Sequence, residues 1–92
     1  MDSIEARKLA LSLQTDFQEL DLHGVYPPEA LQQLDQFLYD TFQTQEQFIK
    51  IIYGIGSGTL KKSVLSYIGD HPLVEEWIDQ GGYCVALMHK NV

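Results

Sequence analysis

The stretch "IIYGIGSGTLKK", residues 51–62, joins an apolar run to three alternating glycines, a threonine and two lysines. It continues the segment "QFIKIIY" at 47–53, which is nearly all apolar and is typical of a central strand covered on at least one face. After the glycines, apolar residues recur at helical spacing at Leu60, Val64, Leu65 and Ile68. The stretch therefore predicts a buried strand, a glycine turn and a helix.

Similar units lie on both sides of this stretch. "ELDLHG" at 19–24 alternates apolar and polar residues and predicts a short strand that ends at Gly24. Pro27 and Pro28 open a helix whose apolar face is formed by Ala30, Leu31, Leu34, Phe37, Leu38 and Phe42. "YCVALM" at 83–88 predicts a last strand after the turn at Gly81-Gly82.

Two segments complete the pattern. "LVEEWID" at 73–79 suits a strand as well as a helical turn, and residues 3–13 predict an N-terminal helix with Ser3 as its cap. The order is a helix followed by βαβαββ, which implies a mixed four-stranded sheet with two crossover helices on one face. Residues 1–17 are expected to be a helical extension, and residues 18–92 are expected to be the domain.

Composition limits the classes of function. The chain has 92 residues, 45% of them hydrophobic and 21% charged, which is typical of one globular domain. No apolar run is long enough to cross a bilayer and no secretory signal is expected, so no membrane partner is predicted. A single cysteine favours the reducing cytoplasm and, with three scattered histidines, argues against a structural zinc site. The net charge of −7 argues against bulk attraction to nucleic acid, so a polyanion would need a local basic patch.

Two loops carry the candidate chemistry. "DLHG" and "YGIGSG" both follow predicted parallel strands and lead into helices, and ligands of open α/β sheets bind at such strand ends. Asp21, His23 and Tyr53 are therefore expected to share one edge of the molecule with the glycine loop. Backbone N–H groups of a glycine loop can approach an anion closely, and lysines add point charges. The predicted phosphate cradle comprises Tyr53, Gly54, Gly56, Ser57, Gly58, Lys61 and Lys62.

Each of these residues also has a purely structural interpretation. The loop matches neither the Walker nor the dinucleotide-binding pattern, and tight turns use glycine for backbone reasons alone. His23 could be a hydrogen-bonded structural histidine, Asp21 a capping carboxylate, and the lysines a solvated helix face. Tyr53 could stack on an exposed base or simply cover the edge of the core. His71 and His89 are interpreted as loop and terminal residues, and Cys84 as a small core residue.

Five segments occur together in one order and resemble a known family. They are "LDLHG" at 20–24, Glu29-Ala30, "IIYGIGSGTLKKSV" at 51–64, "HPLV" at 71–74 and Gly81-Gly82. The combination resembles the small MutS-related (Smr) domain over roughly residues 20–88. The resemblance implies a two-layer α/β sandwich similar to the C-terminal domain of translation initiation factor three. It also implies nucleic-acid binding, with nicking of DNA or cleavage of RNA.

The resemblance also implies roles for single residues. The family's Asp and His fall on Asp21 and His23, its glycines on Gly54, Gly56 and Gly58, and its basic position on Lys61. Tyr53 stands where a histidine usually precedes the first glycine, and tyrosine, with a reference pKa of about 10, is a poor base at neutral pH. "YCVAL" replaces the usual Gly-Ala-Thr run after the double glycine, and the loop between the last two strands is short.

Two functions follow from these features. The first is an endonuclease-type domain that cleaves DNA or RNA with Asp21 and His23 as the catalytic residues; a divalent metal such as Mg²⁺ is left open. The second is a non-catalytic module that uses the same surface to bind a nucleic acid or a protein. The acidic balance predicts that any binding of nucleic acid is weak.

Overall fold

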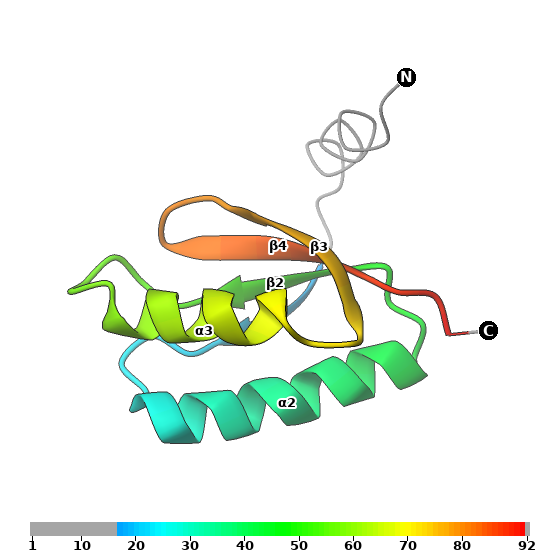
Figure 1. Ribbon diagram of the computed structural model, residues 1–92, viewed down its shortest axis with the longest axis horizontal. Coiled ribbons are helices and arrows are strands. Elements are labelled where there is room, and N and C mark those ends of the chain that lie inside the picture. The colour runs from blue at the N-terminus through cyan, green and yellow to red at the C-terminus, as the bar shows by residue number, and fades with distance from the viewer. Residues whose placement is uncertain (1–16, 92) are drawn as a thin grey trace.

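The computed structural model describes residues 17–91 (Figure 1). Its elements are β1 (Gln18–Asp21), α2 (Pro27–Gln43), β2 (Phe48–Ile52), α3 (Thr59–Gly69), β3 (Val74–Asp79) and β4 (Tyr83–Met88). This order confirms the predicted βαβαββ arrangement, and it shows that the ambiguous segment "LVEEWID" forms a strand from Val74 to Asp79. The helix predicted at 3–13 lies outside the described residues.

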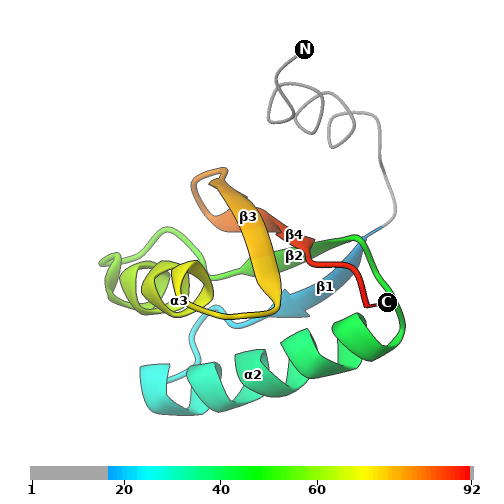
Figure 2. The same cartoon turned by 45° about the vertical axis from the view of Figure 1, so that its right-hand side comes forward.

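The strands form one mixed sheet in the order β1-β2-β4-β3. β1 pairs with β2 in parallel, and β4 is antiparallel to both of its neighbours, so β3 runs in the same direction as β2. Both strand–helix–strand connections therefore advance across the sheet in one direction, and their usual right-handedness places both helices on the same face. Figures 1 and 2 show α2 and α3 side by side against that face, which confirms the two-layer arrangement.

The main core lies between the sheet and the two helices. α2 contributes the fully buried Ala30, Leu34 and Leu38 at the predicted three-and-four spacing. The other buried side chains of this core include Leu22, Ile49, Ile51, Tyr53, Val64, Ile68, Val74, Cys84, Ala86 and Met88. Cys84 is fully buried, as expected of a small core residue. The side chains that alternate with these core residues along β2 and β4 form a second small cluster, which consists of Phe48, Val85 and Leu87.

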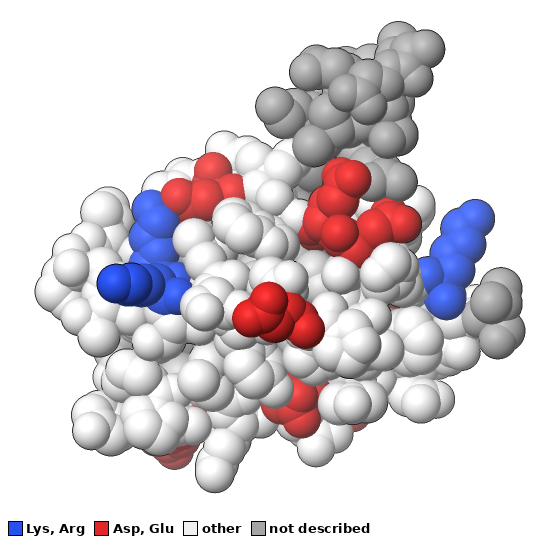
Figure 3. Space-filling model, in the orientation of Figure 1, with Lys and Arg blue, Asp and Glu red and all other residues white. Residues whose placement is uncertain are grey.

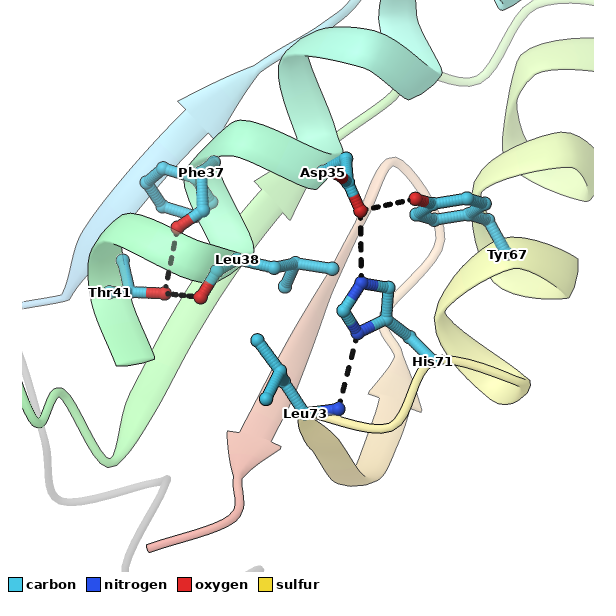
Figure 4. A network of polar contacts seen from close by, with 7 residues as sticks. All are labelled: Asp35, Phe37, Leu38, Thr41, Tyr67, His71 and Leu73. Atoms are coloured by element: carbon cyan, nitrogen blue, oxygen red, sulfur yellow. Dashed lines mark hydrogen bonds and ion pairs between the residues drawn. The ribbon is translucent and has the colours of Figure 1, made fainter. Parts of the chain in front are cut away.

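A polar network centred on His71 links the two helices (Figure 4). Asp35 of α2 accepts a hydrogen bond from the hydroxyl of Tyr67 in α3 at 2.5 Å, and His71 Nε2 lies 3.1 Å from the same oxygen. His71 Nδ1 accepts the backbone N–H of Leu73 at 3.2 Å, so the neutral ring carries its proton on Nε2 and donates it to Asp35. The hydrogen bond from Tyr67, and then that from His71, lower the pKa of Asp35. His71 is thus a buried structural residue at the end of α3.

Candidate functional site

The candidate site lies where β1 and β2 end. These strands are parallel and in register, with Asp21 opposite Ile52, so the loops that leave them emerge side by side. Residues 23–27 and 53–61 line one groove of about 490 Å³. The prediction that "DLHG" and the glycine loop share an edge of the molecule is confirmed, since His23, Gly54 and Gly56 all line this groove.

Asp21 and His23 form a hydrogen-bonded pair at this edge. Asp21 Oδ1 lies 2.9 Å from His23 Nδ1 and 3.1 Å from the backbone nitrogen of His23. The side-chain hydrogen bond from His23, followed by the backbone one, lowers the pKa of the Asp21 carboxyl. An ionised carboxylate only accepts, so Nδ1 carries the proton and, in the neutral ring, Nε2 keeps its lone pair. The histidine side chain is 71% exposed, which leaves it open to a ligand in the groove.

The glycine loop approaches His23 closely. Gly54 has a φ of +83°, and a Cβ atom placed on it would lie 3.4 Å from the Cβ of His23. Gly58, with a φ of +86°, occupies the N-cap position of α3, where no side chain caps the helix. Ser57 is engaged locally with Thr59, their hydroxyl oxygens being 3.0 Å apart. Backbone N–H groups at such a helix start favour an anion, and the phosphate cradle at this loop stays a prediction.

The cradle lysines have different surroundings. Lys61 Nζ lies 2.7 Å from Asp79 Oδ2, so its charge is already balanced within the protein. The hydrogen bond from Lys61, then those from Tyr53 and the Gly81 backbone N–H, lower the pKa of Asp79 to about 2. Lys62 is exposed and has no ion pair within the described residues. Figure 3 shows a group of lysines over the start of α3, with acidic residues over much of the same face.

Tyr53 covers the edge of the core. Its side chain belongs to the main core cluster and the residue is 4% exposed. Its hydroxyl donates to Asp79 Oδ1 at 2.5 Å, and burial, followed by this hydrogen bond, raises its pKa well above the ordinary value. This burial favours the alternative that Tyr53 covers the edge of the core over the alternative that it stacks on an exposed base. Tyr53 also cannot replace a histidine as a base.

Sequence reasoning missed three groups at this site. Asp79 of β3 does not line the groove itself but pairs with Lys61, which does, and no local sequence pattern marks this contact. Ile55 and Tyr26, which are 84% and 74% exposed, also line the groove. Tyr26 gives one weak signal, since it occupies the N-cap position of α2, where small polar residues are preferred.

Two further properties concern metals and membranes. Among residues 17–91 no group of three or more His, Cys, Asp or Glu side chains lies close enough together to hold a metal ion. The sequence-based suggestion of Mg²⁺ therefore stays a prediction. Neither α2 nor α3 has the length and apolar character that a membrane-crossing helix requires.

Comparisons with known proteins agree with this fold and these motifs. The family model for the Smr domain matches residues 20–85. Endonuclease MutS2 of Thermomicrobium roseum is 31% identical over 78 residues, which cover 80% of this chain and 10% of that protein. Ribosome rescue factor SmrB of Shewanella sp. is 33% identical over 78 residues, which cover 82% of this chain and 43% of that protein. The chain thus spans about a tenth of the MutS2 relative's length and less than half of SmrB's.

Solved structures show the same fold. The crystal structure of the Smr domain of Thermus thermophilus MutS2 matches with a TM-score of 0.75 at 26% identity, covering 78% of this chain and 98% of that one. The solution structure of the SMR domain of NEDD4-binding protein 2 matches with a TM-score of 0.66 at 21% identity, covering 86% and 93%.

Proposed function

Because the chain belongs to the Smr domain family, we propose that it binds nucleic acid and acts as an endonuclease-type domain that nicks DNA or cleaves RNA. The observation that carries the proposal is the pairing of the Asp21 carboxylate with the His23 ring at the mouth of the groove. MutS2 relatives that match most of this chain are named as endonucleases.

The chemistry would follow from the proton positions. Asp21 holds the proton of Nδ1, so Nε2 of His23 can take a proton from an attacking hydroxyl or water. The oxygen then forms a bond to phosphorus, and the bond from phosphorus to the leaving oxygen breaks as that oxygen takes a proton from the protonated His23 ring or from water. Backbone N–H groups of the loop at 54–58 can stabilise the charge that develops on the phosphoryl oxygens. Tyr53 supplies no second base, so His23 would carry proton transfer alone.

A second candidate is a non-catalytic module that binds nucleic acid or a protein through the same groove. Two observations favour it: Tyr53, which stands where the family resemblance implies a histidine, is buried, and Lys61 is paired with Asp79. Under this alternative the glycine loop contacts phosphate but no bond is broken. The net charge of −7 makes weak binding at physiological salt the expectation under both candidates.

The test is to incubate the protein with supercoiled plasmid and with structured RNA, in Mg²⁺ and in a chelator. The proposal predicts cleavage that falls by about 10²–10⁴ in His23→Ala, because general acid–base catalysis contributes that factor. His89→Ala is the matched control, since His89 lies outside the groove at the C-terminal end. If the wild type binds nucleic acid without cleaving it, and His23→Ala binds with the same affinity, the non-catalytic module is favoured. Absence of both binding and cleavage would contradict the proposal.

A further inference from the structure

The groove is lined by the two most exposed large apolar side chains of the described region. Ile55 is 84% exposed and Tyr26 is 74% exposed, whereas Tyr39 and Trp77, elsewhere on the surface, are 46% and 38% exposed. Ile55 belongs to the glycine loop after β2, and Tyr26 belongs to the turn between β1 and α2. Exposed apolar side chains that gather at one concave site mark a contact surface.

Both side chains stand on backbone that is held in place. Tyr26 has φ −64° and ψ 136°, the extended conformation that a following proline imposes, and its carbonyl accepts the Ala30 N–H at 2.9 Å. Its side chain makes no capping hydrogen bond. Ile55 is backed by the β3–β4 turn, since its Cγ1 would lie 3.5 Å from a Cβ atom on Gly82. The Gly82 carbonyl in turn accepts the N–H groups of Tyr53 and Gly54 at 3.0 and 2.8 Å.

The chemistry of the groove points to one kind of occupant. It combines an exposed flat ring and an aliphatic side chain with the backbone of a glycine loop and the start of α3, beside Lys61 and Lys62. A ligand that uses all of these must present a flat apolar ring next to an anionic group. An unpaired nucleotide meets this description, because its base can stack on an aromatic ring while its phosphate is held by N–H groups and a cation.

We infer that Tyr26 stacks on an unpaired base, with Ile55 as a second wall, and that the preferred ligand is single-stranded nucleic acid or an unpaired segment of it. The inference rests on the proposed function and specifies its substrate class. In a duplex the faces of the bases are covered by their neighbours, so the ring of Tyr26 would have no face to contact. The same groove therefore discriminates unpaired from paired strands.

The test is to measure dissociation constants by fluorescence anisotropy for a single-stranded oligonucleotide and for the blunt duplex that contains it. Wild type is expected to prefer the single strand. Tyr26→Ala should weaken single-strand binding about 5- to 150-fold, the effect of losing one base–aromatic stack, and should leave duplex binding unchanged. Tyr26→Phe should bind like wild type because it keeps the ring. Tyr39→Ala, a change at another exposed tyrosine, should have no effect on either ligand.

A 2-aminopurine base in the single strand gives a second readout. Its fluorescence should be quenched on binding to wild type and to Tyr26→Phe, and should stay unquenched with Tyr26→Ala at saturating protein. If wild type binds the single strand and Tyr26→Ala binds it equally well with equal quenching, the stacking inference is overturned while the proposed function stands. Preference of the wild type for the duplex would also overturn it. If wild type binds neither ligand, the proposed function fails and the inference fails with it.

Discussion

Replacing Asp79 by asparagine should change the electrostatics of the groove by releasing the charge of Lys61. Asp79 holds three partners: Lys61 Nζ at 2.7 Å, the Tyr53 hydroxyl at 2.5 Å and the backbone N–H of Gly81 at 3.0 Å. Asparagine has nearly the same shape and can still accept from Tyr53 and Gly81 through its Oδ1, but it lacks the charge. The expected result is that Lys61 is released toward the groove while the turn keeps its conformation.

The release of one lysine has a defined size in a salt titration. Each additional phosphate contact steepens the slope of log K against log salt by about 0.7 for a single strand. Asp79→Asn should therefore bind a single strand about 5-fold more tightly than wild type at 0.1 M salt, and the gain should vanish near 1 M. The assay is anisotropy in a series of KCl concentrations. Asp70→Asn is the matched control, because it changes the net charge equally but lies at the far end of α3.

The same substitution should lower stability slightly and alter its pH dependence. The ion pair is partly exposed, with 34% and 30% of the two side chains accessible, so its loss should cost about 1 kcal/mol. The lowered pKa of Asp79, about 2, means that its stabilisation is complete above the unfolded pKa near 3.9 and is lost as the pH falls toward 2. Asp79→Asn should flatten the fall in Tm over this window. If Asp79→Asn changes neither the slope of log K against log salt nor the fall in Tm at acid pH, the claim that Asp79 neutralises Lys61 is refuted.

Two other substitutions test the packing of the site. Gly54→Ala should destabilise by about 1–2 kcal/mol in urea unfolding and reduce any His23-dependent cleavage, because a φ of +83° strains alanine and the new methyl would lie 3.4 Å from His23. Gly56→Ala, where a Cβ meets nothing within 4 Å, should be nearly neutral; equal effects would contradict the role of Gly54. His71→Ala should destabilise the fold by about 2–4 kcal/mol because it removes a buried ring and its hydrogen bonds to Asp35 and to the Leu73 backbone. His89→Ala, at an exposed histidine, should change the stability by no more than about 0.5 kcal/mol. Equal stabilities of the two variants would show that the His71 network is dispensable.

Local patterns were sufficient for most of the fold. The three-and-four spacing in α2 and α3 and the apolar run of β2 specify elements that bury one face, and two parallel strands that each lead into a helix must end at the same edge. β3 was ambiguous because Val74, Trp77 and Ile78 suit either geometry. It is a strand because β4 offers it an antiparallel partner along residues 74–79, a tertiary contact that no local window contains.

The side-chain contacts of the site were harder to predict. Tyr53 lies 26 positions from Asp79, and their hydrogen bond depends on how the β3–β4 turn folds back over the end of β2. The burial of Tyr53, in contrast, could have been predicted from the sequence. Side chains alternate along a strand, so Tyr53 shares the core-facing side of β2 with Ile49 and Ile51. Tyr26 lies outside any periodic element, so only its unusual place at a helix N-cap could have drawn notice.

These contacts together explain how an acidic domain could bind a polyanion. Lys61 is neutralised by Asp79, and Lys50 lies 4.4 Å from the ring centre of Tyr83 in the sheet, so Lys62 is the cation near the groove that the described structure leaves without a partner. Coulomb attraction can then supply only a small part of the affinity, and the slope of log K against log salt should be near −0.7 for a single strand. Most of the binding would have to come from stacking and backbone N–H groups. A shallow salt slope, together with a large loss of affinity in Tyr26→Ala, would agree with binding that comes mostly from stacking and backbone N–H groups. A steep salt slope would contradict it.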